Sequence, residues 1–94
     1  MASKLKDTGE TIEVWFVVKE TERGVSTYDR AFVSRQRAQG LIDHMLARIA
    51  THLFLRDGTF NVYGVLESAR IVTTKRGERL VVHPKALKPL QLSE

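Results

Sequence analysis

The sequence predicts an α+β domain with the element order β-β-α-β-β, in which an antiparallel sheet of about four strands packs one long helix on one face. Two observations lead to this prediction. Apolar residues recur at helical spacing from Ser34 to about Phe54, and a pair of strand-like segments lies on each side of that region. We expect a single domain at residues 11–84, between a flexible N-terminal segment at 1–10 and a C-terminal tail at 85–94.

The first strand pair is indicated by alternation of side chains. In Thr11–Glu20 the residues Ile12, Val14, Phe16 and Val18 share one face of a strand, and Trp15 and Val17 share the other. Arg23 and Gly24 supply a turn, and 26–33 is the return strand. Two strands this close in sequence predict a hairpin.

The helix is predicted by its cap and its apolar stripe. Ser34 is a favourable N-cap residue directly before the stripe, and the Asp57-Gly58 turn follows it. The stripe consists of Ala38, Leu41, Ile42, Met45, Leu46, Ile49, Ala50 and Leu53. Such a stripe is typical of a helix that packs one face on a sheet.

The second strand pair follows the helix. We expect a long β segment from Thr59 to about Thr74, a turn at 75–78 and a last strand at Arg79–His83. Pro84 ends that strand, because proline has no N–H to donate to a ladder.

Composition excludes several classes of protein. The chain has no cysteine, so disulfide scaffolds, thiolate metal sites and cysteine nucleophiles are excluded. The longest apolar run, at 14–18, is far too short for a membrane span, and the N-terminus has no signal-peptide core. We therefore expect a soluble, cytoplasmic protein.

No motif indicates catalysis, a metal or a cofactor. His44 and His52 are eight residues apart on the predicted helix, or about 12 Å along its axis, too far to share a metal ion. His83 stands alone on the last strand, the carboxylates are dispersed, and the glycines form no phosphate loop. The sequence predicts a protein that is not an enzyme, with no catalytic residues, no metal ligands and no cofactor.

Two features predict a homodimer. Trp15 and Val17 make the first strand apolar on both faces, whereas a strand with one solvated face has polar residues there. Small or weakly polar residues also occupy the back of the helix, at Gly40, His44, Ala47 and Thr51, where a solvated face normally carries Lys or Glu. These six residues are the candidate dimer or partner interface.

The charge distribution favours an anionic partner. The net charge is +4, with −1 on residues 1–34 and +5 on residues 35–94. Lys75, Arg76 and Arg79 gather at the tip of the second hairpin, and Arg35, Arg37 and Arg48 lie on the helix. These six residues are the candidate nucleic-acid contacts, because lysine and arginine side chains at a hairpin turn or along a helix can bind phosphate groups.

Three functions stay open. The first is a small, homodimeric nucleic-acid-associated or regulatory protein. The second is a protein-binding inhibitor or adaptor, such as a phage or mobile-element accessory protein that acts on a nucleic-acid-handling complex. The third is a structural dimer domain. Salt dependence separates the first two, because phosphate contacts weaken steeply with salt.

Overall fold

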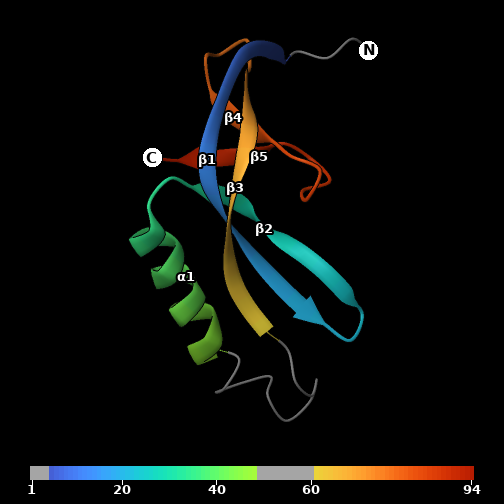
Figure 1. Cartoon of the computed structure of the whole chain (residues 1–94), viewed down its shortest axis with the longest axis vertical. Coiled ribbons are helices and arrows are strands. Elements are labelled where there is room, and N and C mark those ends of the chain that lie inside the picture. The colour runs from blue at the N-terminus through green and yellow to red at the C-terminus, as the bar shows by residue number, and fades with distance from the viewer. Residues whose placement is uncertain (1–4, 49–60) are drawn as a thin grey trace.

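The protein is a small β-barrel with a helix on its side. A computed structural model describes residues 5–48 and 61–94. The elements are β1 (Lys6–Thr21), β2 (Gly24–Phe32), α1 (Arg35–Arg48), β3 (Asn61–Thr73), β4 (Arg79–Val82) and β5 (Leu90–Ser93). The strands close in the order β1-β2-β5-β4-β3, and β3 returns to β1 (Figure 1).

This architecture overturns the predicted fold class. Strands make up 59 % of the described residues, and they form a closed five-stranded barrel with one short helix. The predicted α+β sheet covered by one long helix is therefore wrong. Only residues 35–48 of the predicted helix are described as helical; positions 49–54 of that prediction lie outside the described residues.

The barrel closes through a strand in the segment expected to be a tail. In β5, Leu92 pairs with Ala31 of β2 in parallel, and Leu90 pairs with Val81 of β4 in antiparallel. The β2–β5 pair joins residues about sixty positions apart, and a parallel pair requires a long connection with no local turn signal. For this reason a sequence analysis based on hairpins did not find it.

β1 is the strand that organises the molecule. It pairs with β2 along one edge and with β3 along the other, and it includes Lys6–Glu10 from the segment expected to be flexible. Its pairing shifts between Phe16 and Val18 on the β2 side, and between Asp7 and Thr11 on the β3 side. Such irregularities bend a strand and increase its twist, which a small closed barrel requires.

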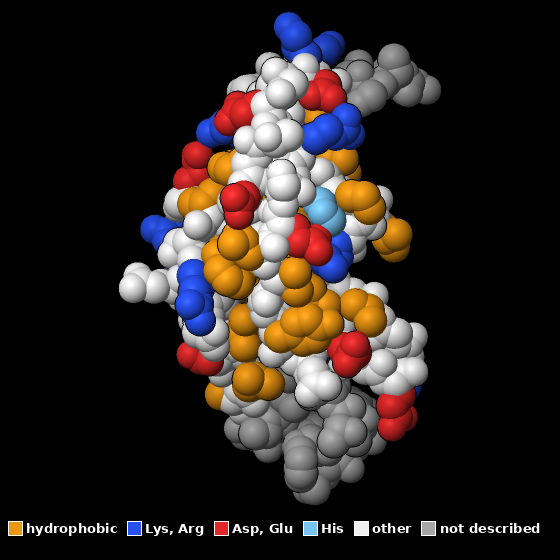
Figure 2. All heavy atoms as spheres, viewed as in Figure 1, with side chains coloured by type: hydrophobic (Ala, Val, Ile, Leu, Met, Phe, Trp, Pro, Cys, Tyr) orange, Lys and Arg blue, Asp and Glu red, His pale blue; other side chains and the backbone are white. Residues whose placement is uncertain are grey.

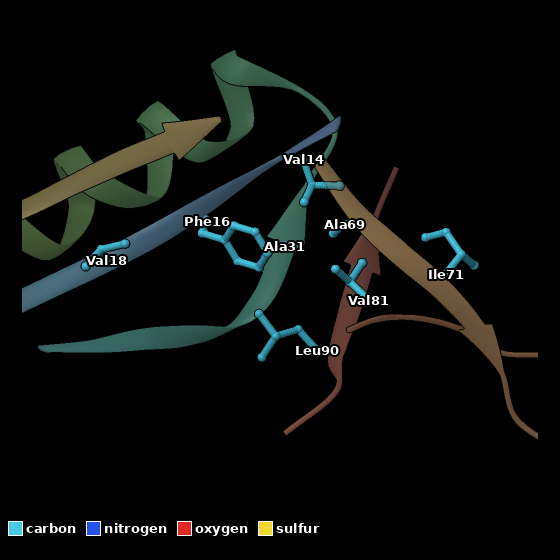
Figure 3. Close-up of a cluster of buried hydrophobic side chains, with 8 residues drawn as sticks. All are labelled: Val14, Phe16, Val18, Ala31, Ala69, Ile71, Val81 and Leu90. Carbon is cyan, nitrogen blue, oxygen red and sulfur yellow. The ribbon is translucent and has the colours of Figure 1, made fainter. Parts of the chain in front are cut away.

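The barrel interior is one of two cores. Side chains from all five strands point toward one another there (Figure 3), and the cluster consists of Val14, Phe16, Val18, Ala31, Ala69, Ile71, Val81 and Leu90. Phe16 is its largest fully buried member. Alternate residues of β1 supply this core, as the alternation of its sequence predicts.

The second core lies between the strands and α1. It consists of the buried residues Val17, Phe32, Ala38, Ile42 and Val62, with Trp15, Leu41 and Met45 packed against them. The second apolar face of β1 is therefore covered within the chain, and Val17 is 1 % exposed. The two-sided strand does not by itself require a second copy of the protein.

Local signals place the ends of the described elements. The Ser34 hydroxyl accepts a hydrogen bond from the Arg37 N–H at 3.2 Å, so Ser34 is the N-cap of α1 as predicted. β4 ends at Val82, two residues before Pro84, and Gly77 takes a φ of +84° in the β3–β4 turn. Among the described residues, no helix combines the length and the apolar character needed to cross a bilayer.

Candidate functional site

The predicted basic tip is only partly available to a ligand. Lys75 and Arg76 are exposed in the β3–β4 turn, and neither makes an ion pair within the described residues. Arg79 differs, because its guanidinium lies 2.6 Å from a Glu10 carboxylate oxygen and 2.9 Å from one of Glu94. The carboxylates of Glu10 and Glu94 therefore compensate the positive charge of Arg79, which was expected to bind phosphate.

The basic residues of the helix lie elsewhere. Arg37 and Arg48 are exposed on α1, while the guanidinium of Arg35 lies 5.8 Å from the centre of the Trp15 ring. In Figure 1 the β3–β4 turn is at the top of the molecule, and α1 is at the lower left. The structure thus divides the six candidate phosphate contacts between two distant places and does not gather them into one patch.

The predicted interface residues also separate. Val17 is buried in the second core beneath the helix, whereas Gly40, His44 and Ala47 are exposed on α1. Thr51 lies outside the described residues. Of the predicted set, Trp15 combines partial burial in the second core with a place on the surface.

A surface of mixed apolar and polar side chains surrounds Trp15. Leu66 of β3 is the cross-strand neighbour of Trp15 and is 45 % exposed. Beside them, Trp15 and Gly64 line a shallow pocket of about 120 Å³ together with residues of the helix, namely Arg35, Ala38, Gln39 and Ile42. We call the group Trp15, Arg35, Gln39, Gly64 and Leu66 the Trp15 surface.

Gly64 explains why this surface is hollowed. A Cβ atom at position 64 would lie 3.4 Å from both Ile42 Cδ1 and Trp15 Cε3, so any larger side chain would fill the pocket. The glycine leaves the face of the indole and the flank of Ile42 open beside Leu66. In the view of Figure 2, hydrophobic side chains gather in the middle of the molecule.

The other side of β3 carries a polar cluster. Glu67 Oε2 lies 3.0 Å from His83 Nε2, and Glu67 Oε1 lies 3.3 Å from Lys85 Nζ. His83 Nδ1 accepts a hydrogen bond from the Lys85 N–H at 3.0 Å, so the neutral ring carries its proton on Nε2. Even so, Glu67 Oε2 is buried and makes no aligned hydrogen bond within the described residues.

The contacts of His83 in this cluster are ones that stabilise the fold. The His83 ring packs on Phe16 with ring centroids 4.9 Å apart, and its Nδ1 holds the turn that follows β4. Within the described residues, no serine or threonine hydroxyl is hydrogen-bonded to Glu67 or His83, and Lys85 is ion-paired to Glu67. Within the same residues, no group of three or more His, Cys, Asp or Glu side chains converges as metal ligands would.

Sequence reasoning identified Trp15 but missed Leu66, Glu67 and the role of Arg35. Leu66 faces Trp15 only in the particular register that the two long β segments adopt, and the sequence did not provide that register. The pairing of β1 with β3 was itself not predicted. Comparison of the chain with known protein families, with curated proteins and with solved structures finds no match.

Proposed function

We propose that this chain is a protein-binding module, an adaptor or inhibitor that carries no chemistry of its own and contacts its partner through the Trp15 surface. The observation that supports this proposal is the pairing of a half-buried Trp15 with Arg35 and an exposed Leu66. Tryptophan and arginine are enriched among the residues that dominate the energetics of protein interfaces.

The rigidity of the site also favours protein binding. Trp15 is held by β1 and by the second core, and Gly64 and Leu66 lie on the neighbouring strand. A partner side chain that enters the pocket would contact the indole without first ordering it. Such preorganisation lowers the entropic cost of association.

A site-specific crosslinking experiment tests the proposal. A photoreactive amino acid replaces Leu66 in one variant and Glu78, an exposed residue of the β3–β4 turn, in the control. Irradiation in the cells that produce the protein should yield protein adducts from position 66 and few from position 78. Adducts that form equally from both positions, or only from position 78, would contradict the proposal.

A second candidate function is nucleic-acid contact, and one observation favours it. Lys75, Arg76, Arg37 and Arg48 are exposed cations without an ion pair among the described residues. Each phosphate contact that is lost should lower the slope of log K against log salt by about 0.9 for duplex DNA.

The two candidates are separated by a matched pair of variants. If phosphates are bound at the turn, Lys75→Ala with Arg76→Ala should weaken duplex binding at low salt, and Arg79→Ala should change it much less because Arg79 is already paired. Filter binding over a salt series measures both. A wild-type protein that shows no binding at low salt would remove this candidate.

A further inference from the structure

The first turn of α1 carries positive charge that no described carboxylate compensates. Arg35 and Arg37 lie in this turn, which contains no acidic residue. Neither arginine makes an ion pair within residues 5–48 and 61–94. The N-terminal end of a helix has a positive partial charge as well, so this part of the surface favours an anion.

Several cations of the barrel have carboxylate partners, whereas Arg35 has an aromatic one. Arg70 lies 2.9 Å from a carboxylate oxygen, and Lys85 lies 3.3 Å from another. The Arg35 guanidinium lies instead over the Trp15 ring, 5.8 Å from its centre. A contact with the ring occupies none of the five N–H donors of the guanidinium in a hydrogen bond, so these donors can meet a carboxylate.

Arg35 also lines the pocket of the Trp15 surface, where α1 passes alongside β1 and β3 (Figure 1). Among the described residues of the pocket wall, Arg35 is the charged one, Gln39 is polar, and the others are apolar. The pocket volume of about 120 Å³ is roughly that of four water molecules in the liquid. The pocket therefore has room for one side chain, and its walls suit a side chain with a methylene stem and an anionic end.

The carboxylates nearest along α1 and β1 do not pair with Arg35. Asp43, farther along α1, accepts a hydrogen bond from the Gln39 side-chain amide at 2.9 Å. Glu13 lies two residues before Trp15 on the same face of β1, and it makes no ion pair within the described residues. The Arg35 guanidinium thus keeps an uncompensated charge at the pocket.

We propose that the pocket of the Trp15 surface binds a glutamate or aspartate side chain of the partner protein, with the carboxylate on the Arg35 guanidinium and the methylene stem on Trp15. This inference names the chemistry of the partner and rests on the protein-binding function proposed above. Arginine binds a carboxylate through two parallel hydrogen bonds, a geometry that matches the planar anion.

Leu66 specifies what surrounds the acidic residue in the partner. It is 45 % exposed, and it is the cross-strand neighbour of Trp15. An apolar residue next to the acidic one would cover Leu66 and shield the ion pair from water. An ion pair that is shielded from water is stronger than one on an open surface. The expected ligand is therefore a short segment in which an acidic residue adjoins an apolar one.

Peptide selection followed by tryptophan fluorescence tests the proposal. Random peptides displayed on phage are selected on the immobilised full-length protein, and the enriched sequences should combine an acidic residue with an apolar neighbour. Trp15 is the single tryptophan of the chain, so a synthetic peptide of the enriched sequence should shift its emission on binding. A selection that enriches basic or uncharged peptides, or no peptides at all, would overturn the proposal.

Two arginine variants form a matched pair. Arg35→Gln should weaken binding of the enriched peptide about tenfold or more, because it removes hydrogen bonds between charged groups. Arg37→Gln removes the same charge from the same helical turn, but Arg37 does not line the pocket, so the affinity should change little. Equal losses in both variants would indicate a general attraction to positive charge and would contradict a carboxylate held by Arg35.

A double-mutant cycle identifies the group of the peptide that contacts Arg35. A peptide in which the acidic residue is replaced by its amide should bind the wild-type protein about as weakly as the original peptide binds Arg35→Gln. The same replacement should have little further effect on binding to Arg35→Gln, because groups in direct contact are not additive. Losses that add independently would overturn the pairing.

A change at Gly64 tests whether the peptide enters the pocket. Gly64→Ala places a methyl group in the pocket, 3.4 Å from Ile42 Cδ1 and from Trp15 Cε3, which is close van der Waals contact. The variant should keep the far-ultraviolet circular dichroism spectrum of the wild type and bind the peptide more weakly. A peptide that binds Gly64→Ala and the wild type equally well would lie outside the pocket and contradict the proposal.

The outcomes also separate this inference from the function on which it rests. Crosslinks from position 66 to a partner protein that persist at equal yield in Arg35→Gln would support the Trp15 surface and overturn acidic recognition. A single-stranded oligonucleotide that shifts Trp15 emission through Arg35, where acidic peptides do not, would overturn both. Loss of peptide binding in Arg35→Gln, together with loss of the crosslinks from position 66 in that variant, would support both.

Discussion

At the scale of single residues, Trp15 shows how the surroundings of a side chain decide its role. Its side chain packs against the second core, and the Arg35 guanidinium lies 5.8 Å from the centre of its ring. Arg35 lies in the first turn of α1, where a cation is unfavourable to the helix dipole. The indole offsets part of that cost through a cation–π contact, worth about 0.5–1 kcal/mol at an exposed site.

Ser34 provides a prediction at this scale. Ser34→Ala removes the acceptor for the Arg37 N–H and should lower the free energy of unfolding by about 1 kcal/mol. Ser34→Asp should retain most of the stability, because aspartate also caps helices. Urea denaturation measures the change, with Ser26→Ala in exposed β2 as the control. Equal effects of the changes at 34 and 26 would contradict the capping role.

At the scale of elements, the middle of β1, at residues 14–18, packs against a core on each of its two faces. Val17 packs beneath α1, and its neighbour Val18 packs inside the barrel. Alternation normally sends one of two adjacent residues to solvent. Here both directions lead to a core, since a helix covers the outer face of the strand while the barrel closes around its inner face.

Alanine substitution on β1 measures this double burial. Val17→Ala and Val18→Ala should each destabilise the protein by about 2 kcal/mol, because each removes two buried methyl groups and leaves a cavity. Val25→Ala, at a position 61 % exposed, should change stability little. Denaturant unfolding checks all three. A small effect at position 17 alone would mean that α1 does not hold the outer face.

The exposed side of α1 gives a further prediction. A Cβ atom at Gly40 meets nothing within 4 Å, and the residue has ordinary helical backbone angles. Gly40→Ala should therefore stabilise the protein by about 0.5–1 kcal/mol. Gly77→Ala should destabilise it, because Gly77 has a φ of +84°. Thermal melts compare the two, and a loss of stability in Gly40→Ala would indicate that another surface packs closely there.

At the scale of the whole molecule, β5 is the strand that closes the barrel. β5 lies between β2 and β4, and Leu90 contributes its side chain to the barrel core. The Arg79 guanidinium joins Glu10 near the start of β1 to Glu94 after β5. Both ion pairs are exposed and worth at most about 1 kcal/mol each, so burial of Leu90 is the larger contribution.

Changes at β5 should therefore affect the entire fold. Leu90→Ala should cost about 2–5 kcal/mol, the range for a buried leucine. Glu94→Ala removes one exposed ion pair, and Leu87→Ala removes a fully exposed side chain, so both should have small effects. Amide hydrogen exchange and urea titration measure the difference. A mild effect of Leu90→Ala would mean that the barrel holds without its fifth strand.

Local features of this protein could be predicted from its sequence. The alternation of β1, the Ser34 cap, the Gly77 turn and the end of β4 before Pro84 each depend on interactions within a few residues. The apolar positions Ala38 and Ile42 also belong to the face of α1 that is buried. Short-range chemistry is sufficient for such features, because the same residues that form the structure also carry the signal.

Contacts between distant residues could be determined only by the tertiary structure. The parallel pairing of β2 with β5 turned an expected tail into the strand that closes the barrel. The pairing of Trp15 with Leu66 and the approach of Arg35 formed a surface from three separate segments, while Glu10 and Glu94 neutralised Arg79. Each of these results depends on which segments become neighbours after the chain folds. Alternation along a strand shows which residues share a face, but it does not show which other element covers that face.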